Sequence, residues 1–173
     1  IYYGFSKSFV DFGKSGQLGD PKEFEAWMNR MKELMDSLPG VEYHGMVNHE
    51  TLTSSYAEAG FILYPTTYPE TGCVTLMKAM SAGAIPITSR FQDSTLPELT
   101  REFDLGPDAH LTSSGAEAAW KETYVAKVVE SVARNVRSDS YADMRARMRE
   151  ESRARFSWTN VAKLWKASFE MEL

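Results

Sequence analysis

The fold is decided by FILYPTTYPETGCVTLMKAMSAGAIPITS, residues 61–89. The apolar runs at its two ends, FILYP and AIPITS, are predicted to be strands. The apolar segment between them is predicted to be a helix that ends at Gly83, because glycine readily takes the left-handed conformation that closes a helix. A strand, a helix and a second strand in this order predict two parallel strands joined by a helical crossover.

The same alternation is predicted on the N-terminal side. IYYGF, residues 1–5, predicts an opening strand that a polar loop follows. A helix is expected after Asp20, which can cap it, with Pro21 in the first turn. VEYHGMV, residues 41–47, predicts another strand, and the next helix should begin at Asn48 and end at Gly60. The repeated alternation predicts an α/β fold in which helices cover both faces of a parallel sheet.

The second half of the chain is predicted to be a loop-rich stretch followed by helices. The helices are expected over residues 116–136, 141–155 and 158–169, the last of them capped by Ser157. One side of that last helix should be buried, through Val161, Leu164, Trp165 and Phe169. Five arginines alternate with acids in the middle helix and are interpreted as a solvated face with salt bridges: Arg145, Arg147, Arg149, Arg153 and Arg155.

Composition limits the classes of protein to consider. The chain has 173 residues, 43% of them hydrophobic, which predicts one domain with one substantial core. The net charge of −5 argues against nucleic acid as a partner. Cys73 is the single cysteine, and no apolar run predicts a membrane span, so a cytoplasmic location is expected. The abrupt start predicts a fragment of a longer protein.

Several short patterns are set aside. GKS, residues 13–15, lacks the glycine that a phosphate-binding loop needs five positions earlier, where Ser8 stands. His44, His49 and His110 have no cysteine or carboxylate at a metal-ligand spacing, so no metal site is predicted. Cys73 has no evident histidine partner that would make it a nucleophile.

The candidate site lies where the first quoted strand passes into the helix. Glu70 follows the carboxyl end of FILYP, the edge at which parallel sheets bind ligands. Gly72, Cys73 and Val74 offer backbone N–H groups that suit a phosphate or diphosphate, and Glu70 could accept hydrogen bonds from hydroxyl groups. Lys78, two turns farther on, could reach a nucleotide or point to solvent. A simpler interpretation stays open, in which Glu70 complements the helix dipole and Lys78 is a surface residue.

PETGCVTLMKAMSAGAIPITS resembles the signature of retaining glycosyltransferases with the GT-B fold, in the glycosyltransferase group 1 family. Its usual form is Glu, seven residues, a second Glu, then Ala-Met-Ala-x-Gly-x-Pro-Val. The order of the preceding segments is similar to that family, and FSWTNVAKLWKASF resembles its closing helices. The resemblance implies a Rossmann-like C-terminal donor-binding domain over residues 1–173, without its first strand and without the N-terminal acceptor domain.

The resemblance also implies roles for residues. Glu70 would be the catalytic residue that contacts hydroxyls of the transferred sugar. The donor diphosphate would be bound by the backbone of Gly72, Cys73 and Val74, and the nucleotide would lie near Gly45, Val47 and Asn48. The second glutamate of the family, which binds ribose, is replaced here by Lys78. This departure puts the ribose contact in doubt.

The implied donor is a nucleotide-diphosphate sugar, with no metal or other cofactor expected. The acceptor, a glycan, lipid or small molecule, would bind the missing domain, which also allows peripheral membrane association of the full-length protein. The isolated chain is expected to be inactive. Two alternatives remain: a non-catalytic GT-B-like scaffold, and a GT-B-like sugar-nucleotide epimerase. A dehydrogenase is disfavoured because GKSGQLG, residues 13–19, has the wrong glycine spacing.

Overall fold

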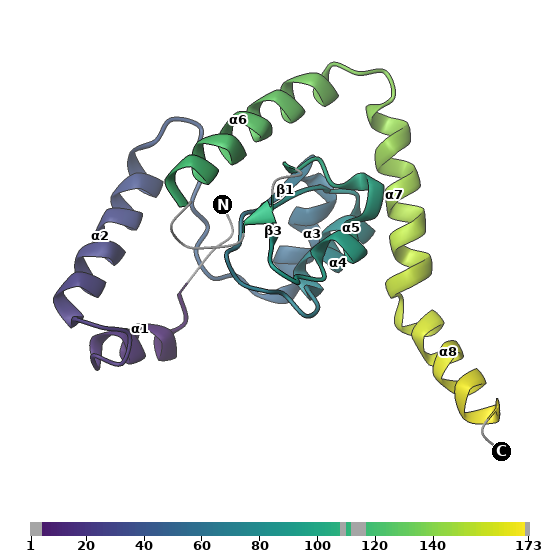
Figure 1. Cartoon of the computed structure of the whole chain (residues 1–173), viewed down its shortest axis with the longest axis horizontal. Coiled ribbons are helices and arrows are strands. Elements are labelled where there is room, and N and C mark those ends of the chain that lie inside the picture. Colours follow the sequence, from purple (N-terminus) through teal and green to yellow (C-terminus); the bar gives the residue numbers. More distant parts are fainter. Residues whose placement is uncertain (1–4, 108–109, 112–116, 172–173) are drawn as a thin grey trace. The chain divides into compact units, whose positions relative to one another are not determined.

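The computed structural model describes residues 5–107, 110–111 and 117–171. It is a mixed α/β structure in which helices predominate (Figure 1). Its contacts divide the chain into two compact units, Ile1–Leu52 and Thr53–Leu173. The opening strand predicted for residues 1–5 falls almost wholly outside the described residues. Within the described part, no helix combines the length and the apolar character that crossing a membrane requires.

The first unit begins with α1 (Lys7–Lys14), where the sequence predicted a polar loop. That prediction is wrong. The Ser6 hydroxyl caps the helix by accepting a hydrogen bond from the Phe9 N–H at 3.2 Å. Phe9 packs edge-on against Phe24 with ring centroids 5.7 Å apart, and Gly13 leaves room for the same ring, since a Cβ there would lie 2.2 Å from it. Aromatic packing against α2 therefore stabilises a short helix whose sequence is mostly polar.

The α2 helix (Pro21–Ser37) begins as predicted, with the Asp20 carboxylate accepting from the Lys22 N–H at 2.8 Å. Residues 41–47, predicted to be a strand, form none. Gly45 has a φ of +63°, and this left-handed conformation interrupts an extended run. The α3 helix (His49–Glu58) follows, and Asn48 caps it as predicted by accepting from the Thr51 N–H at 2.8 Å.

The centre of the second unit is the predicted strand, helix and strand: β1 (Phe61–Tyr64), α4 (Val74–Ala82) and β2 (Ile85–Thr88). The two strands pair in parallel, with Phe61 opposite Ile85 and Tyr64 opposite Thr88. Gly83 ends α4 at a φ of +108°, which confirms the predicted helix end. The strand β2 is buried along its whole length, as a strand covered on both faces must be.

The chain after β2 packs beside the sheet through short elements. These are β3 (Arg90–Phe91), α5 (Leu96–Thr100), the 3₁₀ turn η1 (Arg101–Phe103) and β4 (His110–Leu111), which pairs in parallel with β3. Asp104 organises this region. Its carboxylate accepts hydrogen bonds from the N–H groups of Thr88 and Gly106, both at 2.9 Å, and from the hydroxyls of Thr88 and Thr100.

Three helices complete the unit: α6 (Glu117–Val136), α7 (Tyr141–Phe156) and α8 (Trp158–Met171). Their bounds agree closely with the predicted ranges. Ser157 caps α8 as predicted, accepting from the Asn160 N–H at 3.3 Å. Along α6, the Tyr124 hydroxyl donates to the Ile87 carbonyl at 2.6 Å, which joins this helix to β2. Met148 of α7 is fully buried against the core that includes Ile85.

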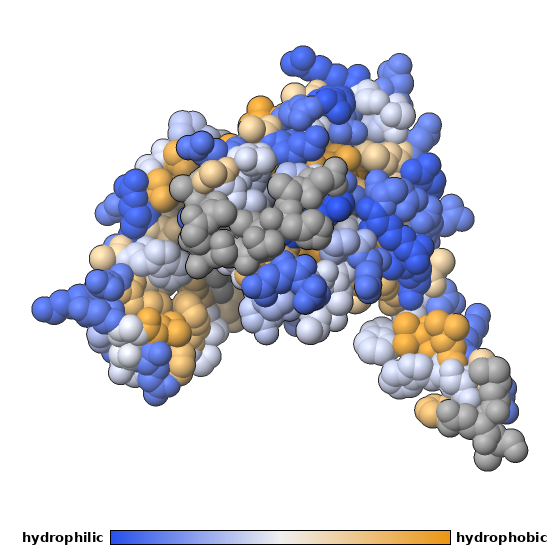
Figure 2. All heavy atoms as spheres, in the orientation of Figure 1, coloured by the Kyte–Doolittle hydropathy of each residue, from blue (hydrophilic) through white to orange (hydrophobic). Residues whose placement is uncertain are grey.

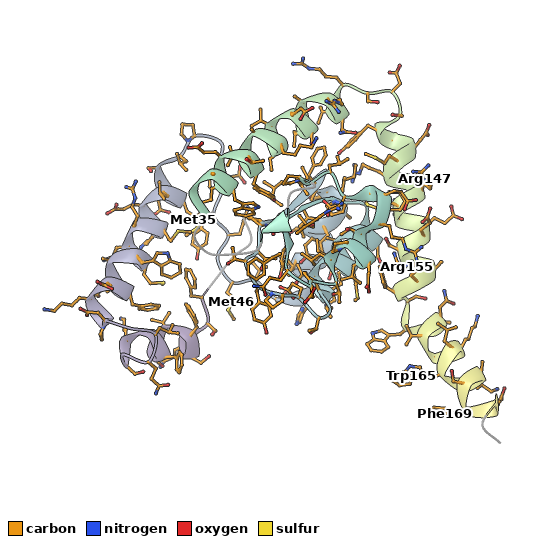
Figure 3. All side chains as sticks on the ribbon, in the orientation of Figure 1. Met35, Met46, Arg147, Arg155, Trp165 and Phe169 are labelled. Atoms are coloured by element: carbon orange, nitrogen blue, oxygen red, sulfur yellow. The ribbon has the colours of Figure 1, made fainter. Side chains whose placement is uncertain are left out.

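The apolar face of α8 was predicted to be buried through four residues, and this prediction is wrong for three of them, while Val161 is half-buried. Leu164, Trp165 and Phe169 are 65%, 62% and 64% exposed. Figure 2 shows hydrophobic surface on α8 next to the hydrophilic surface of α7. Trp165 and Phe169 lie on one side of the helix (Figure 3). The helical period predicted this face, but no described element of the second unit covers it.

The arginines of α7 were predicted to form salt bridges, and the structure corrects this too. The Arg145 guanidinium donates to the carbonyls of Gly83, at 2.8 Å, and Ala59, at 3.0 Å. Arg153 donates to a carbonyl of α4, and Arg155 donates to two carbonyls of α5. The last carbonyls of a helix lack helical partners and carry partial negative charge, so they attract cations.

Candidate functional site

The loop from β1 to α4 is fastened to the end of β2. The Thr66 N–H donates to the Ser89 hydroxyl at 2.7 Å, and that hydroxyl donates back to the Thr66 carbonyl at 2.6 Å. Ser89 is fully buried directly after β2. The two parallel strands therefore end side by side with their loops joined. This edge is the place where sheets of this kind bind ligands.

Glu70 is held at both its backbone and its side chain. Its carbonyl accepts from the Thr95 N–H at 2.8 Å and from the Thr95 hydroxyl at 2.9 Å. Its carboxylate accepts from the Tyr64 hydroxyl at 2.7 Å, through Oε1. Oε2 forms no hydrogen bond with the described residues. A half-buried carboxylate is thus fixed in orientation with one oxygen left for another donor.

The tyrosine that holds Glu70 stays a proton donor at neutral pH. Burial raises the pKa of Tyr64 above its ordinary value, and the hydrogen bond to Glu70 and the neighbouring Cys73 raise it further. The pKa of Tyr56 is also raised, by burial and then by Cys73, while a hydrogen bond with Thr75 acts in the opposite direction. Burial and the neighbouring Glu70 and Cys73 all disfavour the charged phenolate of Tyr64. The Tyr64 hydroxyl therefore keeps its proton and can donate to Glu70 over the physiological pH range.

The start of α4 presents an open approach beside this carboxylate. Gly72 is exposed, and a Cβ placed on it would meet no atom within 4 Å. Its φ does not lie in the left-handed region either, so neither packing nor backbone conformation requires glycine here. The N–H groups in the first turn of a helix have no acceptor within the helix. Val74 begins that turn and is 58% exposed.

Cys73 occupies the capping position of α4 but makes no side-chain capping hydrogen bond. It is 4% exposed and packs with Leu76, Leu96 and Leu99 in the core. Its contribution at this position is packing and a backbone N–H group.

Lys78 is exposed on α4, about one turn beyond Val74. Both residues line a groove of about 1110 Å³ whose other walls come mainly from α7 and α8. Glu70, Gly72 and Cys73 are not among the residues that line it. The predicted site residues of the second unit thus lie along the beginning of α4, with Glu70 before the helix and Lys78 on the wall of the groove.

Gly45, Val47 and Asn48 belong to the first unit. They were expected at the carboxyl end of a strand, and that expectation is wrong because residues 41–47 contain none. They lie instead in the connection between α2 and α3. The side chain of Asn48 is engaged in capping α3.

Sequence reasoning missed Tyr64, Ser89 and Thr95, the residues that hold the loop and its carboxylate. Each stands at the end of a strand or directly before a helix, positions where hydroxyl side chains commonly bond to nearby backbone. Aligning the ends of the two predicted parallel strands would have placed Tyr64 and Ser89 at one edge of the sheet. The contact between Tyr64 and Glu70 had no signal of its own.

No group of three or more His, Cys, Asp and Glu side chains within the described residues is arranged to hold a metal ion. His44 lies 3.6 Å from the Glu42 carboxylate in the first unit. Comparison of the chain with models of protein families, with curated proteins and with solved structures gave no match.

Proposed function

We propose that this chain is the donor-binding domain of a retaining glycosyltransferase with a GT-B, Rossmann-like fold, and that it binds a nucleotide-diphosphate sugar. The observation that carries the proposal is the geometry around Glu70. Its carboxylate is fixed by Tyr64 with one oxygen free, two residues before an unobstructed glycine at the start of a helix. The sequence signature that resembles the family covers the same residues.

The arrangement favours a positioned ligand group over a simple partner of the helix dipole. An acid that only complements a helix dipole needs no fixed orientation, since the interaction depends mainly on distance. Glu70 instead receives two hydrogen bonds at its carbonyl and one at its carboxylate. Such preorganisation favours binding of a hydroxyl group, because ordering a mobile carboxylate on binding would cost free energy and weaken the affinity.

In the proposed reaction, the diphosphate lies against the N–H groups at the first turn of α4. As the bond between the sugar and the diphosphate breaks, negative charge grows on the leaving group, and these fixed dipoles stabilise it. Oε2 of Glu70 accepts a hydrogen bond from a sugar hydroxyl and orients the ring for attack. The acceptor, bound by a separate domain, enters on the face from which the nucleotide leaves. Its hydroxyl oxygen forms the new bond to the sugar as the bond to the diphosphate breaks, and its proton passes to the departing diphosphate.

The test is a calorimetric titration of the chain, and of the longer protein to which we propose that it belongs, with nucleotide-diphosphate sugars and with the corresponding nucleoside diphosphates. Glu70→Gln should weaken binding of the sugar donor about tenfold or more, the effect of losing a hydrogen bond to a charged group. It should leave nucleoside diphosphate binding unchanged. Gly72→Val should weaken both ligands, because its side chain fills the approach to the helix.

Glu150→Gln, an exposed acid on α7, is the matched control and should change neither affinity. If no nucleotide sugar binds the longer protein, the proposal is wrong and a non-catalytic scaffold becomes the better account. Equal losses for both ligands in Glu70→Gln would show that Glu70 does not act through the sugar.

A further inference from the structure

The groove beside Lys78 has helical walls with regularly spaced side chains. On α8, Trp158, Val161 and Trp165 follow one another at helical spacing along one face. On α7, the small residues Ala142 and Ala146 line the groove one turn apart. Small side chains on one wall and aromatic side chains on the other shape a channel that another helix can approach closely.

The apolar wall of the groove is incompletely covered. Trp158 is 81% exposed and Trp165 is 62% exposed, and the apolar face of α8 continues beyond the groove to Phe169. Leaving such side chains in water forgoes a hydrophobic gain that scales with their area. A contiguous apolar surface with a polar border is typical of a protein interaction site.

The charges that line the groove all have one sign. Its lining contains Lys78, Arg145, Arg149 and Arg153, and no aspartate or glutamate. Lys78 and Arg149 form no ion pair with the described residues. Arg145 and Arg153 donate to backbone carbonyls at helix ends, whose partial negative charge offsets theirs only in part, and they form no ion pair with a carboxylate among the described residues. The groove therefore combines an apolar wall with a lining whose charged side chains are all basic.

We propose that this groove binds an amphipathic helix with an apolar face and acidic flanks, supplied by a partner protein. An extended segment would gain little here, because the walls are helices whose backbone groups are already paired. The volume exceeds the range of about 300–1,000 Å³ that is typical of small-ligand pockets. A flat bilayer does not enter a groove. A second copy of α8 would bring Lys163 and Lys166 toward like charges.

The experiment measures binding of a fluorescent helical peptide of about four turns, with leucines at i, i+3, i+4 and i+7 and glutamates beside them. A matched peptide carries lysines in place of the glutamates. The chain should bind the acidic peptide and not the basic one, with an affinity that falls as salt rises. Arg149→Glu combined with Lys78→Glu should weaken binding at least about fivefold. Trp165→Ala should weaken it about tenfold or more.

Lys163→Glu is the matched control, because Lys163 is an exposed lysine of α8 that does not line the groove, and it should leave the affinity unchanged. The altered side chains are exposed, and circular dichroism checks that each variant folds. Equal binding of both peptides, or no binding of either, would overturn the proposal. The proposal would also be overturned if the chain sedimented with phosphatidylserine vesicles but bound neither peptide. It would equally be overturned if the chain formed a dimer that Trp165→Ala abolishes and that the acidic peptide does not disrupt. None of these results bears on the donor titration.

Discussion

Replacing Arg145 by methionine tests whether α7 is held in place by hydrogen bonds to the backbone carbonyls that follow α3 and α4. The variant removes the donors to the Gly83 and Ala59 carbonyls, at 2.8 Å and 3.0 Å, and keeps an apolar stem. Two hydrogen bonds to a charged group amount to about 3–6 kcal/mol. The site is half-buried and water can reach the carbonyls, so we expect about half of this, a loss of about 1.5–3 kcal/mol.

The assay is urea unfolding followed by circular dichroism, with Arg147→Met as the matched control. Arg147 is exposed on the same helix and lies over the Phe103 ring at 5.3 Å, without a hydrogen bond to the described residues. Its replacement should lower the free energy of unfolding by at most about 1 kcal/mol. Arg145→Lys should lose most of the stabilisation, since one ammonium group does not reproduce the guanidinium fork. Equal, small losses for Arg145→Met and Arg147→Met would show that the hydrogen bonds of Arg145 to backbone carbonyls do not stabilise the fold.

Gly106→Ala should lower the free energy of unfolding by about 2 kcal/mol or more, because the new Cβ would lie 2.0 Å from the Thr88 carbonyl oxygen. Gly72→Ala, with open space at the same atom, should change it by less than about 0.5 kcal/mol, and the same urea assay compares them. The raised pKa of Tyr64 means that the unfolded chain releases this proton first, at its ordinary pKa of 10.0. The stabilisation that the protonated Tyr64 hydroxyl gives to the folded state is therefore fully present below pH 10 and is lost as the pH rises above this value. Tyr64→Phe should make alkaline unfolding curves less steep, and an unchanged slope would contradict the assignment.

The sequence was sufficient where local signals decide the structure. Asp20, Asn48 and Ser157 cap helices as predicted, because capping depends on side chains within one turn. Gly83 ends α4 in the left-handed conformation that its position indicated. The parallel pair of β1 and β2 followed from the order of a strand, a helix and a strand. Glu70 was placed correctly in the loop after β1 for the same reason.

The sequence was insufficient where distant contacts decide. The α1 helix depends on the ring of Phe24, and the arginine contacts of α7 join residues 62 and 86 positions apart. Residues 41–47 have an alternation typical of a strand, but Gly45 turns the backbone and no strand forms. The helical spacing of apolar residues in α8 predicted an apolar face. It carried no information on whether another part of the protein packs against that face. The Tyr64 hydroxyl that fixes Glu70 was invisible for the same reason.

The most direct test of the proposed donor site is a crystal structure, with a nucleotide-diphosphate sugar bound, of the longer protein to which we propose that the chain belongs. We expect the diphosphate oxygens within hydrogen-bond distance of the N–H groups at the start of α4, next to Gly72. A hydroxyl of the sugar should donate to Oε2 of Glu70, while Tyr64 keeps its bond to Oε1. A diphosphate bound elsewhere, with Glu70 in contact with no part of the ligand, would contradict the proposed function.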